Sequence, residues 1–423
     1  MMPLALPVEI WERVIDYLWN WPVFLAMCAL VCRAWHARSS GRLVTLTMLV
    51  NSRQTYHFAR RLDIRPELRA RVNLVFICDV LSVHDIDAPK RRPMLHFGTF
   101  ASMLAKKLPA VKSLKIAEAE WTPAATHRNI LLHLSAFASI SELILDYVTF
   151  PSNIVLARFI CALPNLQLLH CASVVCRTKA SNPSLFCASA TQVKKIILEG
   201  TSDDVASLLA LQPGTTSGLE EFWVGWTMNA QDTPSNEAIT AILQSAGPTI
   251  RCVEFRLRQP PGATAEEVRS ASAEASHPRL TLQPCTVLEV FSLTYCMPVL
   301  SSESITAKLS QGFGWMYAIL TSIMSMNMRC LRLAIDVRHI TDTNAYRLIE
   351  RLQEFLDKEQ CTRIDRTFVG DPRFKGLTRV DICLLCNPER TSTDAESWKE
   401  LVIDRFPQLH THGVLHASVT VRV

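Results

Sequence analysis

Four cysteines in this sequence have a spacing that could serve metal binding or redox chemistry. Cys383 and Cys386 form a C-x-x-C pair, but leucines separate them, an apolar strand pattern surrounds them, and no second pair follows. This setting predicts buried cysteines, because a zinc site needs more ligands and a redox thiol needs exposure. Cys28 and Cys32 lie four apart in an expected helix with no nearby ligand partner, so they predict packing as well.

The histidines near the C-terminus and the known motif spacings give no stronger candidate for chemistry. His410, His412 and His416 lie in HTHGVLH, which predicts a solvated turn leading into a last strand. The sequence contains no GxxxxGK[ST], GxGxxG, GxSxG or HExxH. We therefore expect no catalytic residue, no cofactor and no metal ion. The alternative of an enzyme with an unrecognised site would require a cleft with convergent titratable groups.

The composition indicates a folded protein of a reducing compartment. Of the 423 residues, 49% are hydrophobic and 20% are charged, as in globular proteins. The 14 cysteines lie largely in apolar runs, so we expect reduced thiols and a location in the cytoplasm, the nucleus or both. The first residues lack the basic and apolar regions of a signal peptide, so we expect none, and the apolar run 22–32 is too short for a span of about 20 residues, so we expect no membrane partner.

The positive charge is concentrated early in the chain. Residues 51–110 hold 11 Lys and Arg against 5 Asp and Glu, a balance of +6, whereas the whole chain carries +5. Arg61, Arg65 and Arg69 lie four apart and would share a helix face unless Pro66 interrupts the helix. Two interpretations stay open: a solvated helix face, or a patch for an acidic or phosphorylated partner. Nucleic acid is not expected, because few aromatic residues accompany these arginines.

Two expected helices near the N-terminus have more apolar surface than they can bury themselves. In LPVEIWERVIDYL (residues 6–18) the apolar residues spread over about half of the helix circumference, which is wider than the usual stripe. Pro22 predicts the start of a second helix, in which only Arg33 is polar between Val23 and Trp35. A segment of about 40 residues is too small to bury two such helices. They must pack on the following domain or bind another protein.

The residues of this segment resemble an F-box. The pattern Leu6-Pro7-x-Glu9-Ile10, then Val14-Ile15-x-x-Leu18, then Leu30-Val31-Cys32-Arg33-x-Trp35 follows the order of that family. The sequence WNWPV between the helices departs from it, since many members carry an acidic residue there. The resemblance implies a helical domain over residues 1–42 that binds a Skp-type adaptor of a cullin ubiquitin ligase. The adaptor-binding or supporting residues it implies are Leu6, Pro7, Glu9, Ile10, Ile15, Leu18, Leu30, Val31, Cys32 and Trp35. Among them, Glu9 would suit a helix N-terminus.

A short frame of alternating apolar residues recurs through the rest of the chain. Its centres follow one another at steps of 23 to 49 residues: Leu114, Leu143, Leu166, Ile196, Phe222, Val253, Leu288, Leu331 and Val380, with fainter copies at Leu46 and Leu74. Each copy predicts a strand, and helical patterns lie between copies at 203–212, 235–245 and 342–359, the last with Asp342 as N-cap. We therefore expect an α/β fold.

The repeat period resembles degenerate leucine-rich repeats, which are often joined to F-boxes. The resemblance implies an irregular solenoid of alternating helices and strands over residues 43–423, with a flexible insertion at 259–284. An unrelated α/β domain is the alternative. Together, the two resemblances imply a non-catalytic substrate-recognition adaptor of an SCF-type (Skp–cullin–F-box) ubiquitin ligase, whose repeats bind an unknown protein substrate. The alternative function is a repeat scaffold whose N-terminal helices only cap the solenoid.

Overall fold

Parallel strands alternating with helices make up most of the chain. The computed structural model describes residues 7–18, 22–78, 91–122, 129–178, 193–211, 216–227, 235–258, 280–296, 316–338, 345–387 and 394–421. The chain divides into two compact units, Met1–Thr191 and Gln192–Val423. Within each unit, the strand pairs of the described residues are parallel, as expected for an α/β fold, so the predicted fold class is confirmed at this level.

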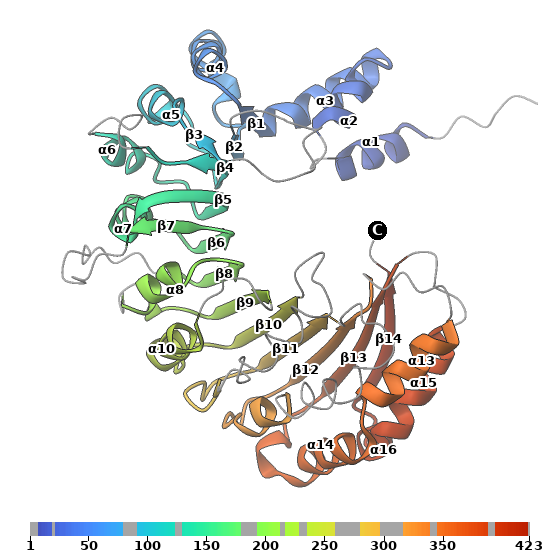
Figure 1. Cartoon of the computed structure of the whole chain (residues 1–423). Coiled ribbons are helices and arrows are strands. Elements are labelled where there is room, and N and C mark those ends of the chain that lie inside the picture. Colours follow the sequence, from blue (N-terminus) through green and yellow to red (C-terminus); the bar gives the residue numbers. More distant parts are fainter. Residues whose placement is uncertain are drawn as a thin grey trace, which may run out of the picture. The chain divides into compact units, whose positions relative to one another are not determined.

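The first unit joins three N-terminal helices to a parallel sheet with the strand order β1-β2-β4-β5-β6. Strand β3 pairs with β4, and β7 pairs with β5. Helices α4 to α7 lie along one side of the strands (Figure 1). The elements are α1 (Val8–Tyr17), α2 (Pro22–Ala29), α3 (Arg33–Thr45), β1 (Leu46–Leu49), α4 (Ser52–Ile64), the 3-10 helix η2 (Pro66–Leu68), β2 (Leu74–Ile77), β3 (Arg92–Pro93), α5 (Phe97–Leu104), β4 (Ser113–Glu120), α6 (Ile130–Leu134), β5 (Glu142–Ser152), α7 (Asn153–Cys161), β6 (Leu168–Ala172) and β7 (Val175–Thr178).

The second unit continues the alternation with the strand order β8 through β14. Its strands are β8 (Lys195–Glu199), β9 (Glu221–Thr227), β10 (Cys252–Arg258), β11 (Val290–Cys296), β12 (Cys330–Asp336), β13 (Arg379–Cys386) and β14 (Leu415–Val421). Its helices are α8 (Asp203–Ala210), α10 (Asn236–Ala246), α13 (Ala345–Phe355), α14 (Lys358–Gly370), the 3-10 helix η5 (Pro372–Phe374), α15 (Asp394–Arg405) and α16 (Pro407–Thr411). Helices α13 to α16 lie on one side of strands β12 to β14 (Figure 1).

One backbone arrangement recurs at the start of the strands. The carbonyl oxygen of Lys112, just before β4, accepts hydrogen bonds of 2.9 Å from the N–H groups of Ser141 and Glu142 at the start of β5. The oxygens of Glu220, Arg251, Glu289 and Arg329 each accept two equivalent bonds from the next strand. The frame centres beside these positions are almost completely buried, with 0–1% exposure for Leu114, Leu143, Ile196, Phe222, Val253, Leu331 and Val380. The predicted strands are therefore confirmed, although β6 and β11 begin two residues after Leu166 and Leu288.

Three strands of the first unit bend at one register position. Glu118, Tyr147 and Ser173 have φ values of 51°, 54° and 50°, in the left-handed region that non-glycine residues rarely adopt. Ala117 pairs with Asp146, and Asp146 pairs with Ala172, so the three residues follow aligned positions. An aromatic cluster lies beyond the bend, where Trp121 stacks on Phe150 at 5.6 Å and both contact Phe159. We infer that burial of these rings offsets the backbone strain.

Two long helices predicted from the sequence are each interrupted. The apolar segment from Pro22 begins a helix as expected, but α2 ends at Ala29 and α3 starts at Arg33, because Cys32 has an extended backbone with φ −159° and ψ 170°. The predicted helix 342–359 is also two helices. Asp357 accepts a hydrogen bond of 2.9 Å from the Gln360 N–H and starts α14 as its N-cap, while Asp342 lies outside the described residues.

The predicted insertion 259–284 is described only at its end. Residues 259–279 lie outside the described part of the chain. Leu280 and Leu282 are 5% and 0% exposed, and the Leu282 N–H donates a bond of 2.9 Å to the Ser322 hydroxyl. These residues therefore belong to the core of the second unit, and the expectation of a flexible loop was wrong for them. Among the described helices, none combines the length and apolarity needed to cross a membrane.

We predict that Gly247→Ala destabilises the second unit. A Cβ atom at Gly247 would lie 2.5 Å from the Pro284 carbonyl oxygen, which belongs to the backbone and has no rotamer through which to move away. Such overpacking typically costs about 1–3 kcal/mol, which chemical denaturation would detect. Gly370→Ala is the matched control, because nothing lies within 4 Å of its Cβ position. Equal stability of the two variants would contradict this account of Gly247.

Candidate functional site

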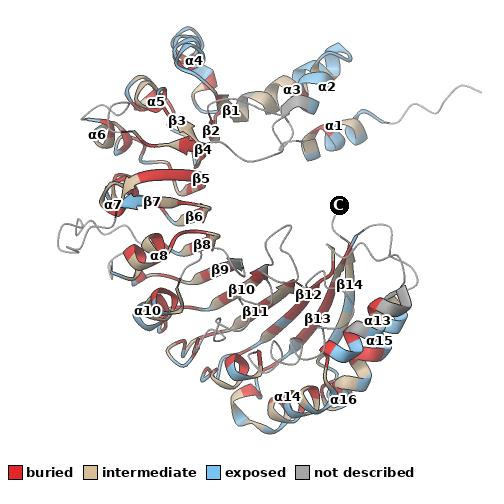
Figure 2. Cartoon of the chain, viewed as in Figure 1, coloured by how far each residue is buried: buried red, intermediate tan, exposed pale blue. Residues whose placement is uncertain are grey.

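The N-terminal helices expose an unusual number of large apolar side chains. Helices α1 and α2 both pack on α3, and their small core includes Ile15 and Leu25, which are 1% and 0% exposed. Trp11 of α1 and Trp35 of α3 add a ring contact of 4.9 Å. Eight other large apolar residues of this segment are exposed, and we call them the N-terminal apolar surface: Val8, Ile10, Val14, Tyr17, Phe24, Met27, Leu30 and Val31. Figure 2 shows these helices largely in the colours of exposed and intermediate residues.

The turn between α2 and α3 carries the most exposed aliphatic residue of this surface. Leu30 is 87% exposed and Val31 is 62% exposed. The turn is closed by backbone hydrogen bonds from Leu30 N–H to the Met27 oxygen and from Val31 N–H to the Cys28 oxygen. Because the backbone holds the turn without help from these side chains, both are available to a partner. Soluble proteins rarely keep such apolar groups together in water unless they form a binding surface.

The sequence-predicted contact residues divide into exposed and supporting groups. Pro7, Glu9, Ile10, Leu30, Val31 and Cys32 are exposed, Leu18 and Trp35 are partly buried, Ile15 is buried, and Leu6 lies outside the described residues. The structure thus places Ile15 in the internal core and Trp35 against Trp11. Sequence reasoning did not assign Val8, Val14, Tyr17, Phe24 and Met27 to the contact set. The nearly continuous apolar sequence of α1 and α2 was the available signal for them.

An ion-pair network fixes α1 to α3. The Asp16 carboxylate of α1 accepts hydrogen bonds of 2.9 Å from Nε of Arg38 and 2.8 Å from Nε of Arg42, both on α3. These guanidinium groups, Arg42 first, hold the pKa of the Asp16 carboxyl well below its usual range. Glu12 lies farther from Arg38, at 3.9 Å. The network therefore fixes the angle at which α1 presents its outer side chains.

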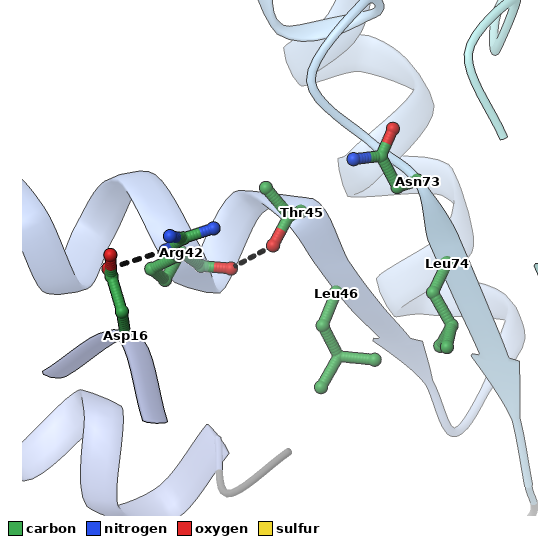
Figure 3. A pocket seen from close by; sticks show the side chains of 6 residues that line it. All are labelled: Asp16, Arg42, Thr45, Leu46, Asn73 and Leu74. Atoms are coloured by element: carbon green, nitrogen blue, oxygen red, sulfur yellow. Dashed lines mark hydrogen bonds and ion pairs between the residues drawn. The ribbon is translucent and has the colours of Figure 1, made fainter. Parts of the chain in front are cut away.

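A hollow of about 380 Å³ lies beside this network. It is lined by Asp16, Arg42, Thr45, Leu46, Asn73 and Leu74, where the N-terminal helices join the first two strands (Figure 3). The Thr45 hydroxyl donates a bond of 2.6 Å to the Arg42 carbonyl, and the Asn73 N–H donates one of 3.0 Å to the Thr45 carbonyl. The Asp16 carboxylate, which lines the hollow, already binds the guanidinium groups of Arg38 and Arg42. We therefore interpret the hollow as part of the structural connection between the N-terminal helices and the first strands. Helix α3 passes through the expected boundary at residue 42 and leads directly into β1.

The basic segment forms a second candidate site on α4. Arg61 and Arg65 line an open hollow of about 440 Å³ together with His57, Arg60 and Ile64. Arg69 is not among them, because it donates hydrogen bonds of 3.0 Å to the Leu62 carbonyl and to the Asp63 carboxylate. Helix α4 ends at Ile64 just before Pro66, as the sequence predicted. The structure thus brings together two of the three predicted arginines and adds His57 and Arg60.

The structure brings none of the cysteine and histidine candidates together as a set of ligands among the residues it describes. Cys383 and Cys386 are buried in β13, and the Cys383 sulfur lies 3.2 Å from the Thr420 hydroxyl. Cys28 and Cys32 do not share a helix face, since Cys32 lies beyond the end of α2. Burial raises the pKa of Cys285 to about 12, so this thiol is protonated at neutral pH. His410 is on α16, and His416 is exposed on β14, the predicted last strand.

We predict that Asp16→Asn loosens α1. The substitution removes the charge that both guanidiniums bind, so local stability should fall by about 1 kcal/mol and amide hydrogen exchange in α1 should accelerate at pH 7. The folded pKa of Asp16 lies below the unfolded value of about 3.9, so its contribution is complete above that pH and is lost as the pH falls through the folded pKa. The difference between variant and wild type should therefore shrink below about pH 4. Glu12→Gln is the control, and an equal effect of both substitutions would contradict the assigned role of Asp16.

Comparison with known proteins assigns no family to these sites. No family model matches the chain, and no curated protein is similar to it. Any function assigned to the chain therefore depends on its own residues and on their geometry.

Proposed function

We propose that this protein is the substrate-recognition subunit of an SCF-type ubiquitin ligase. Helices α1 to α3 would hold a Skp-type adaptor, and through it a cullin, while the strand-and-helix repeats, read as a degenerate leucine-rich-repeat solenoid, would hold a protein substrate. The observation that carries the proposal is the N-terminal apolar surface, which lies on the segment whose sequence resembles an F-box. The proposal assigns no reaction to the chain itself.

The exposure of the individual side chains supports a partner of this kind. Leu30, Val31 and Met27 are 87%, 62% and 59% exposed, although their helices are held firmly by Ile15, Leu25 and the Asp16 network. Transfer of one exposed Leu or Val side chain into an interface contributes about 1.5–3 kcal/mol. Several such residues on one small domain supply enough apolar surface for a stable complex, even after the entropic cost of association.

The strands of the second unit supply a surface suited to a protein substrate. On β8 to β10, the positions between the buried frame residues carry Lys195, Glu221, Trp223 and Arg256. The Lys195 ammonium lies 3.6 Å from the Trp223 ring centroid and 2.6 Å from the Glu221 carboxylate, and the Arg256 guanidinium lies 5.5 Å from the same ring. Trp and Arg are the residues most enriched in the energetically dominant parts of protein interfaces.

The mechanism that follows from such an arrangement is proximity. A chain that holds both an adaptor and a substrate raises the effective concentration of the substrate's lysines near a charged ubiquitin-conjugating enzyme. A proximity mechanism requires binding surfaces that are held rigidly, and it does not require acid–base groups on the chain itself. The stacked parallel strands and the Asp16 network provide rigidity within the first unit.

The proposal predicts that Leu30→Glu with Val31→Glu abolishes binding of a Skp-type adaptor. Because both side chains are exposed, the charges should leave the fold intact, while placing them in an apolar interface should weaken binding by about a hundredfold or more. Co-expression with a Skp-type adaptor, followed by co-purification and calorimetric titration, measures this. Leu132→Glu is the matched control, since Leu132 is 69% exposed on α6, outside the surface. Absence of adaptor binding by the wild-type chain, or equal binding by the Leu30 and Val31 variant, would refute the proposed function.

A further inference from the structure

The hollow on α4 is a candidate binding site that the proposed adaptor function does not use. Thr55, Ala59 and Leu62 bury one face of α4 against the first unit. On the opposite face, His57, Arg60, Arg61 and Ile64 occupy positions i, i+3, i+4 and i+7, so their side chains share one surface. Arg65 extends this surface at the point where the helix ends. We call these five residues the α4 basic hollow.

The cations of the α4 basic hollow have no acidic partner among the described residues. The ion pairs found there do not include Arg60, Arg61 or Arg65. Asp63, the carboxylate within α4, points to other cations: its oxygens lie 2.7 Å from the Lys107 ammonium and 3.0 Å from Arg69. By contrast, Arg38 and Arg42 are both bound to Asp16. The structure thus pairs several arginines of this unit and leaves three of them together around one hollow.

Folding alone does not account for this grouping. A basic residue in the last turn of a helix interacts favourably with the helix dipole, and this explains Arg61. However, Arg60, Arg61 and Arg65 line the same hollow, and like charges that are brought close together repel each other. A helix face that only contacts water could be equally soluble with positive and negative side chains in alternation. The concentration of positive charge therefore indicates an anionic ligand.

We infer that the α4 basic hollow binds a phosphorylated side chain of a protein partner. Guanidinium groups present paired N–H donors that match phosphate oxygens, and three of them line this one hollow. Apolar groups flank the charges: Ile64 is 71% exposed and Tyr56 is 51% exposed. An apolar side chain beside the phosphorylated residue would contact them. A nucleic acid or a membrane surface would instead favour a long stripe of cations.

This inference does not rest on the proposed adaptor function, since it concerns α4 and a direct binding measurement. The probe is a fluorescein-labelled peptide of Gly, Ser and Leu residues with one central phosphoserine, compared with the same peptide without phosphate. Fluorescence anisotropy with the full-length chain should show binding of the phosphorylated peptide only. That binding should weaken as salt rises, because ions screen exposed charges. Inorganic phosphate at millimolar concentration should compete.

The matched variants remove equal charge inside and outside the hollow. Arg61→Ser with Arg65→Ser should weaken peptide binding by about tenfold or more, because two charge-assisted contacts are lost. Arg53→Ser with Arg71→Ser removes the same charge from exposed positions outside the hollow and should leave binding unchanged. Equal binding by both double variants, or equal affinity for both peptides, would overturn the inference. It would also be overturned if phosphatidylserine vesicles or a 20-nucleotide single strand bound with the same dependence on Arg61 and Arg65 while the phosphopeptide did not.

Discussion

The recurring parallel pairing of strands is the constraint on which the rest of the structure depends. At successive strand starts, one carbonyl oxygen accepts two N–H groups from the next strand, as Lys112 does from Ser141 and Glu142. This fixes the register, and the register places each frame residue, such as Leu143 beside Leu114, on the buried face. Because side chains alternate along a strand, the same pairing places Trp223 and Arg256 on the other face. The buried core and the opposite face of the strands are therefore consequences of one backbone arrangement.

The N-terminal helices follow a different principle, since they are too short to bury all of their own apolar residues. Among the described residues, their internal contacts include Ile15, Leu25, the Trp11–Trp35 pair and the ion pairs of Asp16. These contacts fix the helices relative to one another, and α3 connects them directly to β1. The result is a group of packed helices that exposes large apolar residues such as Leu30 and Val31. Under the proposed function, a bound adaptor would bury the apolar side chains that the N-terminal helices leave exposed.

The sequence predicted the parts of the fold that depend on local periodicity. Alternating apolar residues located the strands at Leu114, Phe222 and Val380, and helical spacing located α8 and α10. It failed where a single backbone conformation decides the outcome, as at Cys32, which separates α2 from α3. The aligned left-handed residues Glu118 and Tyr147 were equally unpredictable, because no glycine marks them and the aromatic cluster beyond them forms only in the tertiary structure.

The same distinction applies to the candidate sites. Apolar residues in excess of what a small segment can bury predicted an exposed surface, and Leu30 and Val31 are exposed. The spacing of Arg61, Arg65 and Arg69 predicted one patch, yet Asp63 is six residues before Arg69 and binds it. Helical spacing shows which side chains share a face, but not which of them find a carboxylate after the helix ends. Arg60 and His57 therefore complete the hollow in place of Arg69, and this follows from the turn at Pro66 rather than from the periodicity of α4.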